Sequence, residues 1–328
     1  MPVGVLGLGS YIPDRVVGNA EIGAWSSVTA DWIAQRTGVA ERRYAPDDSV
    51  TSDLAVHAAE QALGGRPGVR ERLVALVFAT CTPDVPQPAT AAILQHKLGI
   101  TTTPAFDVDA VCSGFLFSIA VADGLLSRRD RLGDHALVVG ADMISRIVDR
   151  SDPRIVSLFG DGAGAMLLGF VPDGYGFLAT RMITEGSLHG IVGVDAGGTR
   201  QPIDAAALER GDHLVHMDGR AVRDWVVPTL RNLVQATLDD NRLKVDDIDR
   251  FVFHQANGRM LEKFASDLGI APDRMPSTVA RYGNTGCASL PITLHDSHLR
   301  KPLRRGERIL LAAAGAGLTA AATVLVWY

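Results

Sequence analysis

The sequence predicts an α/β protein built from two similar layered halves, and three observations support this fold class. The chain repeats itself, because Phe78 and Phe253, and likewise Cys112 and Cys287, stand in similar segments 175 positions apart. Within each half, apolar runs typical of strands alternate with helical segments, as in sheets covered by helices. The final run, residues 309–328, has no charged residue and suits strands buried on both faces.

The elements of the first half follow from its apolar periodicity. Predicted strands lie at residues 73–80, 105–108 and 136–139, and predicted helices near 52–63, 89–98 and 112–126. Such alternation implies parallel sheets, in which ligands bind beyond the carboxyl ends of strands. We place the join between the halves in the turn-rich segment 172–176, which gives an N-terminal half, residues 1–172, and a C-terminal half, residues 173–328.

Composition and charge exclude several classes of protein. The net charge of -5 is small and the basic residues are scattered, which argues against a nucleic-acid surface. Residues 309–328 are long enough to span a membrane, but glycines at 315 and 317 interrupt them, so we predict two buried strands and no membrane segment. The first residues lack the pattern of a signal peptide. Three widely spaced cysteines favour neither a disulfide framework nor a metal motif, and indicate a cytoplasmic protein without a metal.

Cys112 is the first candidate for chemistry. It follows the extended run 105–111, at the point where Ser113 and Gly114 open an apolar helix. A helix N-terminus favours the thiolate, and its amides can bind an oxyanion. The alternative is an inert buried cysteine, which is common on apolar helices. From its position alone, Cys112 fits both interpretations.

His254 and Asn284 are the second-half candidates. His254 ends the predicted strand 248–253 and can exchange protons with a substrate, although a structural histidine is the alternative. Asn284 lies between glycines in YGNTG, where a turn residue is the common interpretation. The duplication would direct both side chains toward the same centre as Cys112.

Two glycine-rich runs are not predicted to bind nucleotides. Residues 4–9 are followed by YIPD rather than by a helix, so a dinucleotide site, and with it a nicotinamide-dependent reductase, is excluded. Residues 159–165 lead into an apolar strand, where the glycines permit a tight turn and close packing.

Five motifs together resemble those of the 3-ketoacyl-acyl-carrier-protein synthase III family. They occur in the family's order across nearly the whole chain: WI followed by RTGV from residue 32, DAVCSGF at 109–115, FGDGAGA at 159–165, HQAN at 254–257, and YGNT at 282–285. The resemblance implies a thiolase fold, a homodimer and a catalytic triad of Cys112, His254 and Asn284. It also implies coenzyme A or acyl-carrier-protein thioesters as substrates, with no bound cofactor.

The resemblance implies further roles for individual residues. Cys112 would be acylated, with its own amide and that of Ala316 as the oxyanion hole. Trp32, Arg36 and Asn257 match positions that bind coenzyme A. Arg259 matches a basic residue used in docking the carrier protein.

Four positions depart from the family pattern. Gln87 stands where a phenylalanine usually closes the acyl pocket of the neighbouring subunit, which suggests a larger or more polar acyl group. An arginine that faces the adenine has no clear match, and Arg154 is nearby. Ser266 and Asp267 replace a basic pair on the docking helix, and residues 315–317 read Gly-Ala-Gly rather than triple glycine.

Three functions are therefore compared. A decarboxylative condensing enzyme that initiates fatty-acid or polyketide synthesis is favoured by His254 and Asn284. An acyltransferase of the same fold, which would pass the acyl group to a hydroxyl, an amine or a second carrier, is favoured by the altered pocket and docking residues. A non-catalytic partner subunit would be expected to lack the nucleophile, so Cys112 argues against it.

Overall fold

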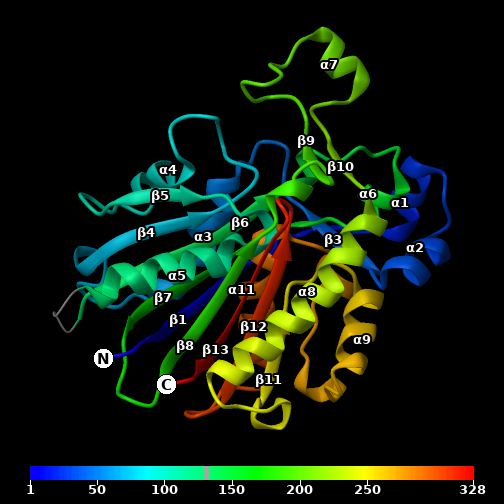
Figure 1. Cartoon of the computed structure of the whole chain (residues 1–328). Helices are drawn as coiled ribbons and strands as arrows, with labels where there is room; N and C mark the ends of the chain where they lie inside the picture. Colours follow the sequence, from blue (N-terminus) through cyan, green and yellow to red (C-terminus); the bar gives the residue numbers. More distant parts are fainter. Residues whose placement is uncertain (129–132) are drawn as a thin grey trace.

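Two mixed β-sheets form the framework of the computed structural model, which describes residues 1–128 and 133–328 (Figure 1). The first sheet has the order β1 (Val3–Tyr11), β7 (Asp161–Phe170), β6 (His135–Met143), β4 (Leu73–Ala79), β5 (Ala105–Val108). The second has the order β11 (Arg250–Phe253), β12 (Arg308–Gly315), β13 (Thr319–Val326), β8 (Gly176–Thr184). Two small hairpin-like sheets pair β2 (Arg15–Gly18) with β3 (Glu41–Tyr44), and β9 (Val192–Val194) with β10 (Val215–Met217).

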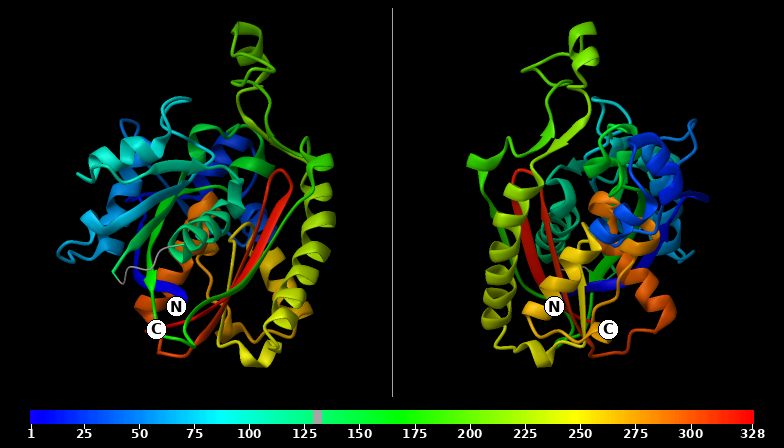
Figure 2. Two further views of the ribbon diagram at one scale, coloured as in Figure 1. Left: turned by 60° about the vertical axis from the view of Figure 1, so that its left-hand side comes forward. Right: turned by 90° about the vertical axis from the view of Figure 1, so that its right-hand side faces the viewer.

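Helices separate and cover the two sheets, so the molecule has five layers (Figures 1 and 2). The central layer, between the sheets, holds α5 (Gly114–Ser127) and α11 (Ser289–Arg300). The outer face of the first sheet is covered by α3 (Thr51–Leu63) and α4 (Thr90–Lys97), and that of the second by α8 (Gly219–Asp240) and α9 (Gly258–Asp267). Burial of apolar side chains between these layers supplies the main driving force for folding.

The duplication predicted from the sequence is confirmed element by element. Helices α5 and α11 begin 175 positions apart, and so do the short 3₁₀ turns Val111–Ser113 and Gly286–Ala288 that precede them. One element breaks the pattern. The counterpart of β5 is not a strand but a single helical turn, α10 (Val279–Tyr282).

The expectation of parallel sheets is only partly correct. Strands β4, β5 and β6 are parallel, and so are β11 and β12. The other neighbours are antiparallel, because β7 runs against both β6 and β1 in the first sheet, and β13 runs against both β12 and β8 in the second. The prediction of two strands in residues 309–328 is confirmed, since a three-residue turn joins β12 to β13. Among the described residues, no helix is both long and apolar enough to cross a membrane.

One segment projects from the layered body. Residues 185–218, here called the projecting arm, contain the β9–β10 pair and carry α7 (Ala205–Arg210) at their tip (Figure 1). Near its base, a smaller apolar cluster joins β10 to α1 (Asn19–Ser26), α2 (Ala30–Thr37) and α6 (Pro153–Val156). No pattern noted in the sequence predicted the arm.

Candidate active site

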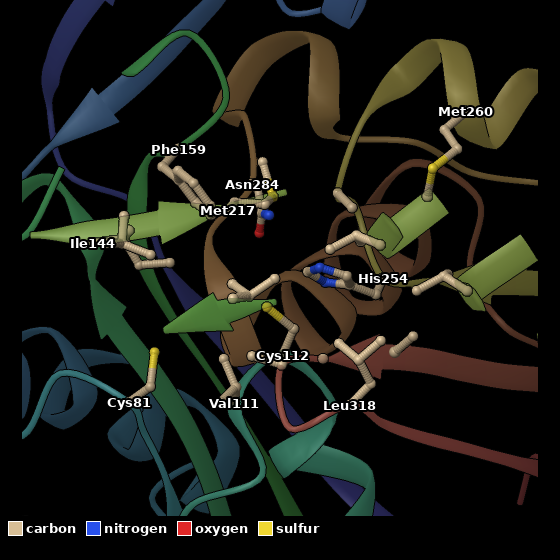
Figure 3. Close-up of a pocket in the computed structure, with 18 of the residues that line it drawn as sticks. Cys81, Val111, Cys112, Ile144, Phe159, Met217, His254, Met260, Asn284 and Leu318 are labelled. Atoms are coloured by element: carbon tan, nitrogen blue, oxygen red, sulfur yellow. The ribbon is translucent and has the colours of Figure 1, made fainter. Parts of the chain in front are cut away.

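A strained turn presents Cys112 at the centre of the molecule. Val111 has φ +46°, a left-handed conformation that is unfavourable for a β-branched residue. Asp109 Oδ1 accepts the Val111 N–H at 3.1 Å, and Ser113 Oγ donates to the Ala110 carbonyl at 2.8 Å. These bonds hold the turn and leave the Cys112 thiol partly exposed to an internal cavity (Figure 3).

The electrostatic environment of Cys112 differs from the sequence expectation. Burial raises the pKa of the thiol to about 12, and the nearby Asp142 carboxylate adds to this rise. The opposing effect of the backbone amide at the start of the helix is smaller. Removal of the thiol from water therefore outweighs the helix terminus. Cys112 rests as a neutral thiol and must lose its proton as it attacks.

His254 is a neutral imidazole whose tautomer is set by Ser289. Burial lowers the pKa of His254 to about 4. Its Nδ1 lies 2.6 Å from Ser289 Oγ, and the same oxygen accepts the Gln255 N–H at 3.2 Å. The Ser289 hydroxyl uses both its acceptor and its donor capacity when it accepts the Gln255 N–H and gives its own hydrogen to Nδ1. We therefore assign the ring proton to Nε2, where it can be donated to a substrate.

Asn284 is oriented in the same way by its own loop. Its Oδ1 accepts the Gly286 N–H at 3.0 Å, which leaves the Nδ2 amino group as the end that can bind a substrate. The Asn284 backbone pairs with the segment before β7, through Leu158 and Gly160. The interpretation of Asn284 as a turn residue therefore accounts for its Oδ1, which accepts a hydrogen bond within the loop. Its Nδ2 amino group remains available at the cavity.

The loop between β12 and β13 packs directly against the Cys112 turn. A Cβ atom added to Gly315 would lie 2.8 Å from the Cys112 nitrogen and 2.9 Å from the Ala110 carbonyl oxygen. Thr319 Oγ1 lies 2.7 Å from Ser113 Oγ, a buried hydroxyl pair that fastens the loop to the turn. The main chain that carries Ala316, the second predicted oxyanion donor, is thereby held beside the nucleophile.

Asp142, which no motif indicated, joins the two halves beneath the site. Its buried carboxylate accepts the backbone N–H groups of Cys81 and Cys287, each at 2.8 Å, and a hydroxyl hydrogen bond from Thr80 at 3.1 Å. Cys287, the counterpart of Cys112, is fully buried and donates its thiol to the Ala79 carbonyl at 3.1 Å. The second-half turn is therefore structural, whereas the first-half turn faces the cavity.

The three predicted catalytic residues line one internal cavity of about 140 Å³. Figure 3 shows Cys112, His254 and Asn284 together near its centre, with Cys81, Ile144 and Met260 farther out. Its lining is otherwise almost wholly apolar. Apolar cavities of roughly this size can hold a benzene-sized molecule, so the enclosed space suits a small acyl group.

A larger, open cavity leads from the surface to this site and contains the predicted coenzyme A residues. Trp32, Arg36 and Asn257 line it, together with Arg154, whose register was uncertain in the sequence. The Arg36 guanidinium lies 5.4 Å from the Trp32 ring centroid. Asn257 also has a structural role: its Oδ1 caps α9 at the Met260 N–H, and its Nδ2 donates to the Arg36 carbonyl.

Gln87 and Arg259 lie outside the internal cavity of their own chain. Gln87 is on an exposed loop between β4 and α4. Arg259, at the start of α9, borders a surface groove with Lys263 and forms an ion pair with Glu262 at 3.1 Å.

Sequence reasoning missed Ser289 and Asp142. Ser289 could have been noticed, because it stands 175 positions after Gly114, at the first residue of the matching helix.

The layered fold and the site together define a thiolase-fold acyltransferase. Residues 106–186 match the family model described as 3-oxoacyl-[acyl-carrier-protein (ACP)] synthase III, and residues 238–327 match its C-terminal model. The chain is 45% identical to acetoacetyl CoA synthase NphT7 of a Streptomyces species, over 98% of each chain. It is 40% identical to beta-ketoacyl-[acyl-carrier-protein] synthase III 3 of Streptomyces coelicolor, over 98% of this chain and 96% of that one.

A solved structure supports the same assignment. The synthase III of Thermus thermophilus shares the fold with a TM-score of 0.90, at 36% identity and 99% coverage of both chains. This chain belongs to the 3-oxoacyl-acyl-carrier-protein synthase III family.

Proposed function

We propose that this chain condenses an acyl thioester with a malonyl thioester, with loss of carbon dioxide, through an acyl group carried on Cys112. The observation that carries this proposal is the arrangement of polar groups in an apolar cavity. A thiol, an imidazole and a carboxamide line the same small space, and the hydrogen bonds of Ser289 and Gly286 leave Nε2–H and Nδ2–H as free donors.

In the first step, the Cys112 sulfur attacks the donor carbonyl, and the bond from that carbonyl to the donor sulfur breaks. The proton of the Cys112 thiol ends on the departing thiol, so atoms and charge balance. Two amides beside the nucleophile, those of Cys112 and Ala316, would bind the oxyanion of the tetrahedral intermediate. The neutral thiol implied by the raised pKa makes proton removal part of this step.

In the second step, His254 and Asn284 hold the thioester carbonyl of the malonyl group. Their N–H groups stabilise the enolate that forms when the carboxylate leaves as carbon dioxide. The α-carbon then attacks the acyl-cysteine carbonyl, the bond from that carbonyl to sulfur breaks, and the released Cys112 thiolate takes up one proton from the solvent. A neutral His254 suits this role, because a hydrogen-bond donor is needed there at neutral pH.

Coenzyme A is the proposed carrier of both substrates. The open cavity combines an aromatic ring, Trp32, with arginines at positions 36, 154, 210, 220 and 223, a set suited to a nucleotide with phosphate groups. Ion pairs do not separate the two surfaces, because Arg154, Arg210 and Arg223 of the open cavity are paired with Asp152, Asp212 and Asp224, as Arg259 of the α9 groove is with Glu262. The aromatic ring of Trp32 beside Arg36 is the feature that favours a nucleotide-bearing carrier.

A homodimer in a reducing compartment such as the cytoplasm completes the proposal. The projecting arm exposes Val194, Ile203 and Leu208, which suits contact with a second copy of the chain. The exposed loop with Gln87 would then reach the partner's acyl pocket. All three cysteines are free thiols, as a cysteine nucleophile requires.

The test of the covalent step is intact mass after incubation with short acyl-coenzyme A donors. We expect one acyl adduct on the wild-type chain and none on Cys112→Ala. Cys81→Ala is the matched control, since Cys81 is the other thiol lining the cavity, and its adduct should persist. An adduct on Cys112→Ala, or none on the wild-type protein with any donor, would rule out the mechanism.

A second measurement separates condensation from simple acyl transfer. Malonyl-coenzyme A and malonyl-carrier protein are each added to the acylated enzyme, and carbon dioxide release is followed. Release with malonyl-coenzyme A at the higher kcat/KM supports the proposal. Acyl transfer to a hydroxyl or amine without carbon dioxide would instead support the acyltransferase alternative.

A further inference from the structure

The internal cavity has two apolar arms on different sides of Cys112. One extends past the nucleophile toward Cys81 and Ile144. The other, here called the α8–α9 arm, is bordered by Val226 and Leu230 of α8, Leu261 and Phe264 of α9, and Ala314 of β12. Figure 3 places Cys81 and Ile144 on one side of Cys112 and Met260 on the other.

Small residues on the second sheet create the α8–α9 arm. Alternate residues of β12 face the helices, and the last of these is Ala314. It pairs with Ala320, and Ala312 pairs with Ala322, so four alanines occupy the site end of this face. Larger side chains, Leu310 and Val324, occupy the same face farther from the site. Of these four alanines, Ala314 is the one that borders the internal cavity, so its small side chain is what leaves space at the end of this face nearest the site.

The chemistry of the arm selects a hydrocarbon. None of its five bordering side chains can form a hydrogen bond, and a water molecule needs two to four polar partners to be held. The polar groups of the cavity, Cys112, His254 and Asn284, are not among the five residues that border the arm. An alkyl group entering the arm gains from burial without leaving a polar group unpaired.

The position of the arm assigns this alkyl group to the acceptor rather than to the donor. Substrates enter from the open cavity, which shares Ala256, Met260 and Asn284 with the internal one. In this assignment the acyl chain of the donor on Cys112 occupies the part of the cavity lined by Cys81 and Ile144, neither of which lines the open cavity. The α8–α9 arm instead opens on the side of His254 and Ala256, where the acceptor thioester is held in the proposed function.

We propose that the α8–α9 arm receives a short alkyl substituent on the α-carbon of the acceptor, so that the enzyme uses alkylmalonyl thioesters. This inference rests on the proposed function. The bond formed joins the substituted α-carbon to the acyl carbonyl, the bond from that carbonyl to the Cys112 sulfur breaks, and carbon dioxide leaves. The product is an α-branched 3-ketoacyl thioester.

The test compares malonyl-, methylmalonyl- and ethylmalonyl-coenzyme A with the acylated wild-type enzyme. We expect kcat/KM for the two alkylated acceptors to lie within tenfold of that for malonyl-coenzyme A. A preference for malonyl-coenzyme A above 100-fold would overturn this inference and leave the proposed function intact. Failure to form the acyl-enzyme, or to release carbon dioxide from any acceptor, would overturn the proposed function itself.

Variants that fill or enlarge the arm locate the alkyl group. Ala314→Val and Ala314→Phe should lower the ratio of ethylmalonyl to malonyl kcat/KM stepwise, by tenfold or more for Phe. Leu230→Ala enlarges the arm and should raise the ratio of butylmalonyl to malonyl kcat/KM. Ile144→Phe is the matched control, because Ile144 lines the internal cavity outside the arm and does not line the open cavity, and it should change the donor preference instead. Ratios that move with Ile144 but not with Ala314 or Leu230 would contradict the assignment.

Discussion

At the scale of single residues, hydrogen bonds that no sequence motif displays decide which atoms face the substrate. Ser289 fixes the proton of His254 on Nε2, and the Gly286 amide fixes the orientation of Asn284. The motifs identify the residue types, but the direction of the His254 side chain depends on its contact with α11, and that of Asn284 on a hydrogen bond within its own loop. Those contacts form only in the folded protein.

Ser289→Ala is expected to lower kcat for carbon dioxide release about 10- to 100-fold, because His254 loses the partner that sets its tautomer. Acylation of Cys112, followed by intact mass, should change less. The matched control is Ser118→Ala. Ser118 is buried in α5, and its hydroxyl has no hydrogen-bond partner in the described part of the chain, so its loss should leave both steps near wild type. Equal losses in the two variants would indicate a packing effect only.

The lowered pKa of His254 predicts a specific pH dependence of stability. In the unfolded chain this imidazole takes up a proton near its ordinary pKa of 6.5, whereas in the folded chain it does so near 4. The unfolded state therefore binds more protons between these values, and the free energy of unfolding falls as the pH drops through this window. The loss is on the order of 3 kcal/mol.

His254→Gln removes this contribution, and urea titrations of both proteins between pH 7 and pH 4 measure it. Subtracting the two curves cancels the other histidines, among them His135, His295 and His298. The wild-type protein should lose more stability than the variant across the window. Parallel curves would show that the pKa of His254 is not lowered.

At the scale of elements, the strands and helices of the repeated core were predictable from apolar periodicity. The predicted segments 52–63 and 105–108 correspond closely to α3 and β5. The helical turn α10 was not predictable from the repeat, because its counterpart in the first half is a strand. In place of that strand, the second half has a short segment in which Asn284 pairs with the region before β7. The projecting arm also lies outside the repeat.

The loop that joins β12 to β13 should tolerate no side chain at Gly315. Gly315→Ala would bring a Cβ within 2.8 Å of the Cys112 nitrogen, so the loop and the nucleophile must separate. We expect the rate of acylation to fall at least ~100-fold, as misplacement of a reacting group by about 1 Å can do. Acylation reactions that are quenched at successive times and analysed by intact mass measure this rate.

Gly124→Ala is the control for this substitution. Gly124 is exposed within α5, and a Cβ there would meet no atom within 4 Å. Alanine should stabilise the helix by roughly 0.5–1 kcal/mol without slowing acylation. Acylation at the wild-type rate in Gly315→Ala would contradict the close approach of loop and turn.

At the scale of the whole molecule, the repeat at a constant offset predicted two similar layered α/β halves, and the resemblance of the motifs implied the thiolase fold. Neither predicted where the internal cavity extends. The α8–α9 arm depends on alanines of two strands facing side chains of two helices, and residues such as Ala314 and Phe264 become neighbours only through the tertiary fold. Ala314 in isolation resembles any other core alanine.

The projecting arm gives a prediction about assembly. Ile203 and Leu208 are 55% and 51% exposed, which is unusual for large apolar side chains unless a partner covers them. In the proposed homodimer these side chains are covered, so the double variant Ile203→Glu, Leu208→Glu should elute from size-exclusion chromatography at half the apparent mass of the wild-type protein. Elution of the wild-type protein as a monomer would remove the basis for a role of Gln87 in a neighbouring pocket.

The two cysteine turns show how one backbone shape can serve two ends. They occupy matching positions 175 residues apart and share a cysteine, but their other residues differ, Val111 and Ser113 in one and Gly286 and Ala288 in the other. At Cys287 the Asp142 carboxylate and the Ala79 carbonyl hold the main chain and the sulfur in place, so this turn belongs to the seam between the halves. A repeated fold therefore need not repeat its chemistry, because the contacts of each copy decide whether its thiol meets the cavity or the core.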